Sequence, residues 1–487
     1  MIEKELSLSS PTSLSRWYTQ TRLLMGLALP ICGAQLAQAG MSTVDVIMTG
    51  RLSATDLAAV SVGSSLWLPL MLFMAGTLMG LTPIVAQLLG AERTETIRSR
   101  VHQGLWIALA MGLIVAVLLH QAVMPIFTWM SVPPAVAERS SAYLAAVAFG
   151  MPGSALFMAL RAFSDGMNHT RPALWISLLG LAVNIPFNYL LIHGGPGLVE
   201  LFGEQLPATI KTLPALGALG CGIATAISMW AMALAMLLYT RQSRAYGSVA
   251  LWQSLTRPHV GHIRELLFVG VPIGVSIFVE VTLFTLIALF IASLGEVVVS
   301  AHQVALNVTS LLFMLPLSLG MALTVRVGNT LGAGYLSMAR FVAWHGIALS
   351  LLIALLNNVI LWLAAEPVLA LYTHNTEVQE VALSLIGLAM IYQISDSLQV
   401  NMAGALRGYK DTRIIMIITL IAYWLVGLGG GHLLGIGALP GLEAPLGVHG
   451  YWIGLVAGLT VAAVLLGLRL QTISKAVSNG ERTIQSN

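Results

Sequence analysis

The sequence contains few charged residues and almost no cysteine. Only 9% of its 487 residues are charged, against about 25% in ordinary soluble domains, and 57% are hydrophobic. A soluble fold with a mean hydropathy of +0.86 would expose far too much apolar surface. Its two cysteines, Cys32 and Cys221, both fall in apolar stretches and give no basis for a disulfide. We therefore expect a polytopic membrane protein.

The sequence also lacks the local motifs of several enzyme classes. It has no glycine-rich phosphate loop followed by lysine, no clustered metal-ligand spacing and no plausible nucleophile–base pair. These absences weigh against ATP-driven pumping and against hydrolysis within the membrane. We expect a protein that is not an enzyme and that uses neither a cofactor nor a nucleic-acid partner.

Long apolar stretches dominate the rest of the chain and predict an all-α integral membrane fold. Each is about 20 residues or longer, enough to cross a hydrocarbon core of about 30 Å. An open sheet is excluded because every backbone group must be paired internally in lipid. The twelve predicted transmembrane helices are 22–48, 56–84, 101–125, 137–160, 172–193, 217–240, 264–293, 298–325, 341–365, 379–405, 413–436 and 448–470.

The basic residues are distributed unevenly among the connections between these helices. Of the 23 Lys and Arg residues, only Arg51, Arg139 and Lys211 lie in the odd-numbered connections. The other twenty lie near the two termini or in the even-numbered connections. By the positive-inside rule, this distribution predicts that both the N and the C terminus are cytoplasmic.

The chain also repeats itself with a shift of 242 residues, which becomes 230 in the last predicted helix of each half. Pro30 matches Pro272, and the Leu-Gly-Ala segment at 89–91 matches the same three residues at 331–333. A shift that holds over a long stretch is not expected from composition alone. The repeat therefore predicts two related halves.

Six helices per half is an even number, so the halves should have the same orientation in the membrane. We expect two six-helix bundles related by a pseudo-two-fold axis along the membrane normal, with a central cleft. The predicted organisation is a cytoplasmic N-terminal segment at 1–21, an N-lobe at 22–240, a cytoplasmic linker at 241–263, a C-lobe at 264–470 and a cytoplasmic tail at 471–487.

Three acidic residues, Asp45, Glu280 and Asp396, lie inside apolar stretches that have no Lys or Arg near their middle. An ionised carboxylate at the centre of a bilayer costs roughly 2.5–3.5 kcal/mol on insertion scales. Such residues must carry protons, bind mobile cations or face water. The pattern predicts a protein that moves cations.

In the first half, Asp45 is expected to lie near Asn184 and Asn188, which are four residues apart on one helix face. One carboxylate and two amide oxygens make a hard-oxygen site, suited to Na⁺ or to a proton held on Asp45. Both possibilities remain open from the residues alone.

In the second half, Glu280 and Asp396 are expected to share a site, with Tyr392 one helical turn before Asp396. Two carboxylates in a dry site favour a proton or another cation between them. They could share a proton, a monovalent ion such as Na⁺, or the ammonium group of a drug.

Other polar residues recur at helical spacing on otherwise apolar helices and are predicted to line the cleft. They are Gln38, Ser42, Ser276, Gln303, Asn307 and Gln399. The alternative is that such residues join neighbouring helices, at about 0.6 kcal/mol each. Pro30 and Pro272 occupy the same place in both halves and predict helix bends near a substrate site, although a purely structural kink is equally compatible.

Several motifs together resemble the multidrug and toxic compound extrusion (MATE) family, most closely its NorM branch. They are Thr43–Gly50 (TVDVIMTG), Pro83–Gln87 (PIVAQ), Ala301–Ala305 (AHQVA), Pro316–Gly320 (PLSLG) and Leu406–Gly408 (LRG). The resemblance extends over essentially the whole chain.

The resemblance implies a V-shaped carrier of two six-helix bundles in the cell inner (cytoplasmic) membrane. Members exchange H⁺ or Na⁺ moving inward for cationic, amphipathic drugs and dyes moving outward. Its partners would then be the lipid bilayer, a monovalent cation and cationic small molecules, and we expect a monomer. Carried over by position, Asp45 is the first-lobe coupling acid, with Asn184 and Asn188 beside it. Glu280, Asp396 and Tyr392 match the second-lobe cation site.

Three other interpretations remain. A lipid-linked precursor flippase of the same superfamily would need a basic cleft for pyrophosphate, whereas this chain places its cations at the cytoplasmic edge. A passive cation channel could also use buried acids, but it would not couple two fluxes. An integral-membrane enzyme lacks a reaction centre in this sequence.

Overall fold

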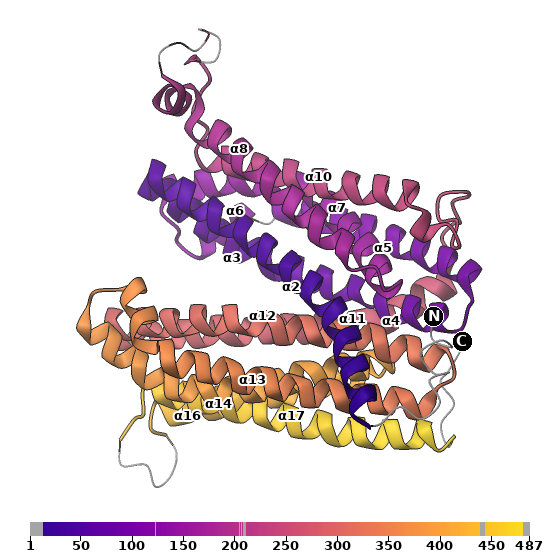
Figure 1. Cartoon of the computed structure of the whole chain (residues 1–487). Helices are drawn as coiled ribbons and strands as arrows, with labels where there is room; N and C mark the ends of the chain where they lie inside the picture. Colours follow the sequence, from indigo (N-terminus) through magenta and orange to yellow (C-terminus); the bar gives the residue numbers. More distant parts are fainter. Residues whose placement is uncertain are drawn as a thin grey trace. The chain divides into compact units, whose positions relative to one another are not determined.

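The computed structural model describes residues 13–121, 123–203, 205, 207, 211–438 and 444–480. Most of the expected N-terminal segment and part of the expected C-terminal tail lie outside these residues. The regular elements of the described chain are all helical (Figure 1). Their bounds are α2 Ser13–Leu52, α3 Ala54–Met79, α4 Leu81–Gly90, α5 Thr94–Gln121, α6 Val123–Trp129, α7 Pro134–Gly166, α8 Arg171–Phe202, α10 Ala218–Gln242, η1 Arg244–Tyr246, α11 Val260–Ile291, η2 Ala292–Leu294, α12 Glu296–Gly332, α13 Leu336–Tyr372, α14 Thr376–Gly408, α15 Thr412–Leu420, the π-helical η3 Ile421–Gly430, α16 Gly431–Gly435 and α17 Val448–Ser478.

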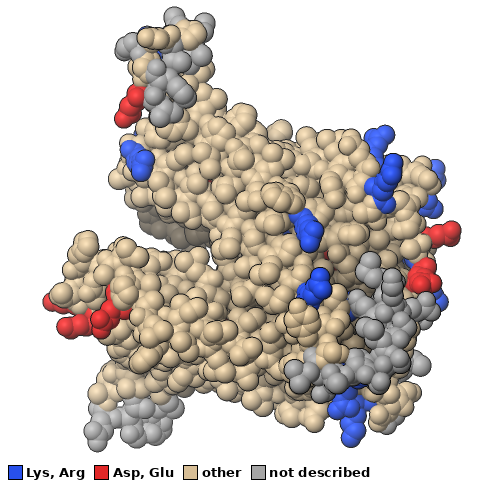
Figure 2. All heavy atoms as spheres, in the orientation of Figure 1, with Lys and Arg blue, Asp and Glu red and all other residues tan. Residues whose placement is uncertain are grey.

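Twelve helical spans of the described chain are long and apolar enough to cross a membrane, which confirms the predicted all-helical, multi-pass fold. The span predicted at 217–240 is Ala218–Gln242, and the one predicted at 413–436 is Thr412–Gly435. Others are longer than predicted, as in α13, because a helix can continue beyond the apolar stretch that hydropathy detects. Figure 2 shows a face that is almost entirely uncharged, with its charged side chains mostly near the helix ends.

The chain divides into two compact units. Unit 2 contains Gly33–Phe278, and unit 1 contains the described residues up to Cys32 together with those from Val279 onward. Both boundaries fall inside helices, in α2 and in α11. Pro30 and Pro272 lie within these two helices, which remain helical on both sides of the proline.

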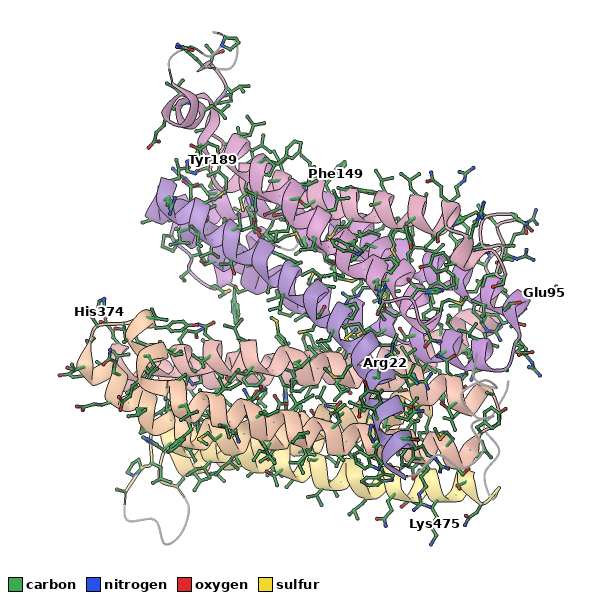
Figure 3. All side chains as sticks on the ribbon, viewed as in Figure 1. Arg22, Glu95, Phe149, Tyr189, His374 and Lys475 are labelled. Carbon is green, nitrogen blue, oxygen red and sulfur yellow. The ribbon has the colours of Figure 1, made fainter. Side chains whose placement is uncertain are left out.

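In unit 2, α7 packs along α10 and also contacts α5 (Figure 1). Close approach depends on small residues at the contact. A Cβ on Gly222 would lie 2.6 Å from the Tyr143 carbonyl oxygen, so only glycine fits there. Glu95 at the start of α5 and Tyr189 on α8 lie toward opposite ends of this unit (Figure 3).

In unit 1, α12 and α14 form the most extensive contact, and α13 and α17 pack against α14. A Cβ on Gly404 of α14 would overlap the backbone carbonyl of Gly320 of α12. His374, at the turn between α13 and α14, and Lys475, near the end of α17, mark opposite ends of this helical layer (Figure 3). This packing positions the face of α14 that carries the predicted acid.

The segment between α10 and α11 is part of unit 2 and is held against it. Tyr246 is 2% exposed, and its hydroxyl forms a 2.6 Å hydrogen bond with that of Ser164. Burial raises the pKa of Tyr246 to about 12, so this hydroxyl remains neutral at physiological pH. The backbone N–H of Thr256 donates to Nδ1 of His102 on α5 at 3.1 Å. The segment is therefore packed against unit 2 and does not form a free linker.

Candidate functional site

Asp45 lies in the interior of unit 2, where three side chains donate hydrogen bonds to it. The carboxylate comes from α2 and is only 6% exposed. Its Oδ1 accepts from Nδ2 of Asn184 at 3.2 Å and from Nδ2 of Asn188 at 2.5 Å. Its Oδ2 accepts from the hydroxyl of Thr225 at 3.1 Å. The structure thus brings together the three residues grouped from the sequence and adds a fourth.

The two asparagines come from one face of α8 because they are four residues apart. Nδ2 of Asn188 also lies 2.9 Å from Oδ1 of Asn184. Oδ1 of Asn188 is buried and has no hydrogen-bond partner in the described part of the chain. The cluster therefore offers carboxylate, amide and hydroxyl oxygens, which are the ligands that hard cations prefer.

Sequence reasoning missed Thr225. This residue lies on α10, in a run of Gly, Ala, Ile and Met residues with no polar stripe that would have drawn attention to it. Its hydroxyl reaches Asp45 only because α10 packs against α8. Cys221, one turn earlier on α10, is fully buried, and its thiol also interacts with Asp45.

A second cluster lies inside unit 1, where Glu280 of α11 meets Tyr392 and Asp396 of α14. Asp396 is 1% exposed and interacts electrostatically with both other residues. Neither of its carboxylate oxygens has a well-formed hydrogen bond to a described residue. In the described part of the chain, this carboxylate therefore lacks the hydrogen-bond donors that Asp45 has.

Aromatic rings surround the second cluster. The ring of Tyr392 lies edge-to-face with that of Phe284, at a centroid distance of 6.4 Å, and with that of Trp452, at 6.0 Å. Faces of aromatic rings attract cations as well as apolar groups. Such walls suit an amphipathic cation better than a bare metal ion.

Arg407 corrects one expectation from the sequence. The sequence places it in an even-numbered, cytoplasmic connection and predicts no basic neighbour inside the membrane for any of the three acids. In the structure Arg407 belongs to the last turn of α14, is 7% exposed, and its positive charge acts on Glu280. The expectation is therefore wrong for Glu280, because α14 continues to Gly408 and its end is folded into unit 1. Tyr423 of η3, fully buried, also lies near this cluster and was not predicted.

Two of the residues predicted to line a cleft form hydrogen bonds within unit 2. Gln38 donates from Nε2 to the hydroxyl of Ser177 at 3.2 Å, which links α2 to α8. The hydroxyl of Ser276 donates to the carbonyl oxygen of Pro272 at 2.8 Å, one turn earlier on the same helix.

The other four predicted cleft residues differ in exposure. Gln399 on α14 is 4% exposed and faces the interior of unit 1. Ser42 on α2 and the pair Gln303 and Asn307 on α12 are exposed. The four-residue spacing of that pair gives α12 an exposed polar stripe.

Within the described residues, no three His, Cys, Asp or Glu side chains gather closely enough to hold a metal ion. The Asp45 cluster contains one acid among neutral oxygens. This arrangement suits a monovalent cation or a proton that binds and leaves.

Comparison with known protein families matches residues 30–190 and 272–431 to the MatE family. The chain belongs to the MatE family. The two matched segments begin at Pro30 and Pro272, and so coincide with the repeat found in the sequence. The resemblance to multidrug and toxic compound extrusion transporters is confirmed.

Similar proteins cover nearly the whole chain. The multidrug resistance protein MdtK of Yersinia enterocolitica is 40% identical over 465 residues, which are 96% of this chain and 98% of that protein. MdtK of Yersinia pestis (strain Pestoides F) is 41% identical over 462 residues, which are 95% of this chain and 97% of that protein.

Solved MATE structures share the fold. A MATE in the bent conformation has a TM-score of 0.83 at 18% identity, over 97% of this chain and 100% of that one. The eukaryotic MATE transporter AtDTX14 has a TM-score of 0.80 at 22% identity, over 96% of this chain and 100% of that one. The predicted MATE-type helical fold is therefore confirmed.

Proposed function

We propose that this MatE-family protein is a secondary multidrug antiporter, which exports cationic, amphipathic drugs and dyes and takes up H⁺ or Na⁺ in exchange. The observation that carries the proposal is the surroundings of Asp45, a carboxylate only 6% exposed in an apolar span and held by neutral donors. A bare charge at such depth costs roughly 2.5–3.5 kcal/mol. A travelling cation offsets that cost in one part of the cycle and leaves in another.

The second cluster supplies a second place for positive charge in this proposal. The charge of Arg407 partly compensates Glu280, which leaves Asp396 as the acid with the stronger demand for a mobile partner. The rings around Tyr392 would contact the apolar part of a drug. A proton, a Na⁺ ion and a drug ammonium would then compete for the same carboxylate.

Exchange requires that drug and coupling ion disfavour each other. If ion binding weakens drug binding by some factor, drug binding weakens ion binding by the same factor. In the proposed cycle the outward-open carrier takes up the ion, releases the drug and turns inward. The inward-open carrier then releases the ion and binds a new drug cation.

The proposed setting follows from the distribution of charge and from the relatives. Two lobes, 22–240 and 264–470, would alternate access around the 241–263 linker, with both termini in the cytoplasm. The bacterial MdtK relatives bear the name of multidrug resistance proteins, which supports an inner-membrane exporter. We propose that the monomer is the transport unit.

The test is ethidium exchange in reconstituted vesicles, driven by a Na⁺ gradient alone and then by a pH gradient alone. Asp45→Asn and Asp396→Asn remove one acidic charge each with little change in shape. Each should abolish exchange driven by the coupling ion while the protein still inserts and folds. Asp411→Asn is the matched control, since that carboxylate pairs with Arg469 at 2.6 Å outside both clusters.

Full exchange by both Asp45→Asn and Asp396→Asn would overturn the antiport proposal. Drug movement that persists with no ion gradient, and that cannot be driven uphill by either gradient, would instead indicate a passive pathway.

A further inference from the structure

Asp56, in the first turn of α3, joins three helices at one end of unit 2. The carboxylate is 5% exposed. Its Oδ1 accepts the backbone N–H of Ala218 on α10 at 3.0 Å. Its Oδ2 accepts Nη1 of Arg139 on α7 and the hydroxyl of Ser53, each at 2.5 Å. Both carboxylate oxygens are therefore engaged, although no part of the proposed transport cycle uses this residue directly.

The contact with α10 is made at the point where that helix begins. The first backbone N–H groups of a helix have no acceptor within the helix, so an acid placed there is stabilising. Gly217, just before Ala218, has φ of +56°, a conformation that favours glycine. A Cβ at Gly217 would also lie 2.6 Å from Oδ1 of Asp56. Glycine is thus required for Asp56 to reach the helix.

The same end of α10 is joined to α8 by backbone hydrogen bonds. The regular helix of α8 is interrupted at Gly194 (φ 61°, ψ −154°), so carbonyls just before it lose their usual helical partners. Leu216 N–H donates to the Leu191 carbonyl at 2.9 Å, and Gly217 N–H donates to the Ile192 carbonyl at 3.3 Å. These bonds form a clasp between α8 and α10, and Asp56 holds the clasp from a third helix.

The clasp lies directly beside the residues that hold Asp45. Asn188 is one turn before Ile192 on α8, and Thr225 is two turns, about 10 Å, after Ala218 on α10. These two residues donate to opposite oxygens of Asp45. If α10 shifted so that Thr225 moved about 1 Å away from Asp45, the 3.1 Å bond would exceed hydrogen-bonding distance. The register of the two helices therefore determines how the carboxylate is held.

The second half of the chain provides an internal comparison, because it keeps the clasp. Gly447, before α17, has φ of +54° and corresponds to Gly217 through the shift of 230 residues that holds for the last helix of each half. Leu446 N–H donates to the Leu434 carbonyl at 3.2 Å, and Gly447 N–H donates to the Gly435 carbonyl at 3.1 Å. The backbone arrangement is thus repeated in unit 1.

The second half does not keep the ion pair. The repeat shift of 242 places Val298 at the position of Asp56 and Val381 at the position of Arg139. It also places Ile287 at the position of Asp45. The Asp56–Arg139 ion pair and the acid at position 45 therefore occur together in the first half, and the clasp of the second half forms without either of them.

We propose that Asp56, held by Arg139, is a positioning residue for the Asp45 site and sets the affinity of that site for the coupling cation. It fixes α10 against α8, so that Thr225 and Asn188 grip Asp45 in the geometry that binds the cation. The inference rests on the proposed antiport function. An isolated pair with Arg139 half exposed contributes little to stability, so its value here is preorganisation.

The experiment measures exchange by the full-length protein in vesicles while Na⁺ and H⁺ are titrated separately. Asp56→Asn and Arg139→Gln should raise the cation concentration for half-maximal exchange by about three- to tenfold, with the maximal rate per folded protein unchanged within about twofold. Arg139→Lys keeps a positive charge at this position and should bring the half-maximal cation concentration most of the way back to the wild-type value. Asp411→Asn, which breaks the comparable pair with Arg469 in unit 1, should leave the half-maximal concentration unchanged.

The outcomes separate the two proposals. If Asp45→Asn exchanges drug normally, the antiport proposal fails at this site. If Asp45→Asn is inactive but Asp56→Asn and Arg139→Gln keep the wild-type half-maximal concentration, only the positioning role fails. An equal shift in Asp411→Asn would show a general loss of stability and would also overturn the positioning role. If Asp56→Asn does not fold, Arg139→Gln alone decides the question, since Arg139 is 48% exposed and leaves the contact with Ala218 in place.

Discussion

Replacement of Gly404 by alanine tests the packing that positions the second cluster. The new Cβ would lie 2.8 Å from the Gly320 carbonyl carbon and 2.9 Å from its Cα, and still closer to the carbonyl oxygen, whereas ordinary contacts begin at 3.4 Å. All these atoms are backbone, so no side chain can rotate away. We expect α14 to move away from α12 by roughly half an ångström or more.

The energetic cost follows from that displacement. Overpacking of this kind typically costs about 1–3 kcal/mol. The same movement stretches the 2.9 Å hydrogen bond from the Thr324 hydroxyl to the Gly404 carbonyl, which is worth about 1 kcal/mol. Alanine returns at most about 1 kcal/mol through its higher helix propensity. We therefore expect the free energy of unfolding to fall by about 1–3 kcal/mol.

The assay is thermal unfolding of the purified protein in detergent, with Gly387→Ala as the matched control. Gly387 lies on the same helix, and a Cβ added there would have nothing within 4 Å, so its replacement should leave the unfolding temperature unchanged or raise it. Equal unfolding temperatures for the two variants would refute the reasoning. Since α14 also carries Asp396, Gly404→Ala should in addition lower the rate of exchange.

Two further predictions concern unit 2. Thr225→Val keeps the side-chain shape but removes the hydroxyl that donates to Asp45. A hydrogen bond to a charged group contributes about 1.5–3 kcal/mol, so the cation concentration for half-maximal exchange should change about tenfold or more. Thr225→Ser keeps the hydroxyl and should restore the wild-type concentration. An unchanged concentration would contradict a cation site at Asp45. Arg100→Gln breaks the 2.9 Å ion pair between α5 and Glu265 of α11, which is partly buried, and should lower the free energy of unfolding by about 1–3 kcal/mol. A double-mutant cycle with Glu265→Gln measures the pair, and strictly additive effects would mean that the pair contributes nothing.

Hydropathy and charge placement predicted the spans and the acids because both are local properties. A membrane helix needs about 20 apolar residues in sequence, so each of the twelve spans is visible without knowing its neighbours. A carboxylate within such a stretch stands out for the same reason, which is how Asp45, Glu280 and Asp396 were found. The shift of 242 residues likewise revealed the repeat, which the two segments of the family match reproduce.

The groups that complete each cluster could not be predicted in this way. Thr225 is 180 residues from Asp45 in sequence, and a lone hydroxyl on an apolar helix carries no pattern. Arg407 was assigned to a connection because the last turn of its helix is polar, and only packing shows that this turn is buried beside Glu280. No pattern in the sequence singles out Asp56, and only the fold brings the backbone nitrogen of Ala218 within 3.0 Å of its Oδ1.

The sequence by itself determined the twelve spans and the three acids within them, since insertion into lipid depends on the composition of each stretch alone. Its motifs determined the resemblance to MATE proteins. Only the tertiary structure decided which neutral donors hold Asp45, which acid has a basic neighbour, and where the two compact units divide within α2 and α11. The reason is one of scale. A hydrogen bond forms only within about 3 Å, so it depends on the register between helices far apart in the chain, and helical periodicity specifies the face of a residue but not that register.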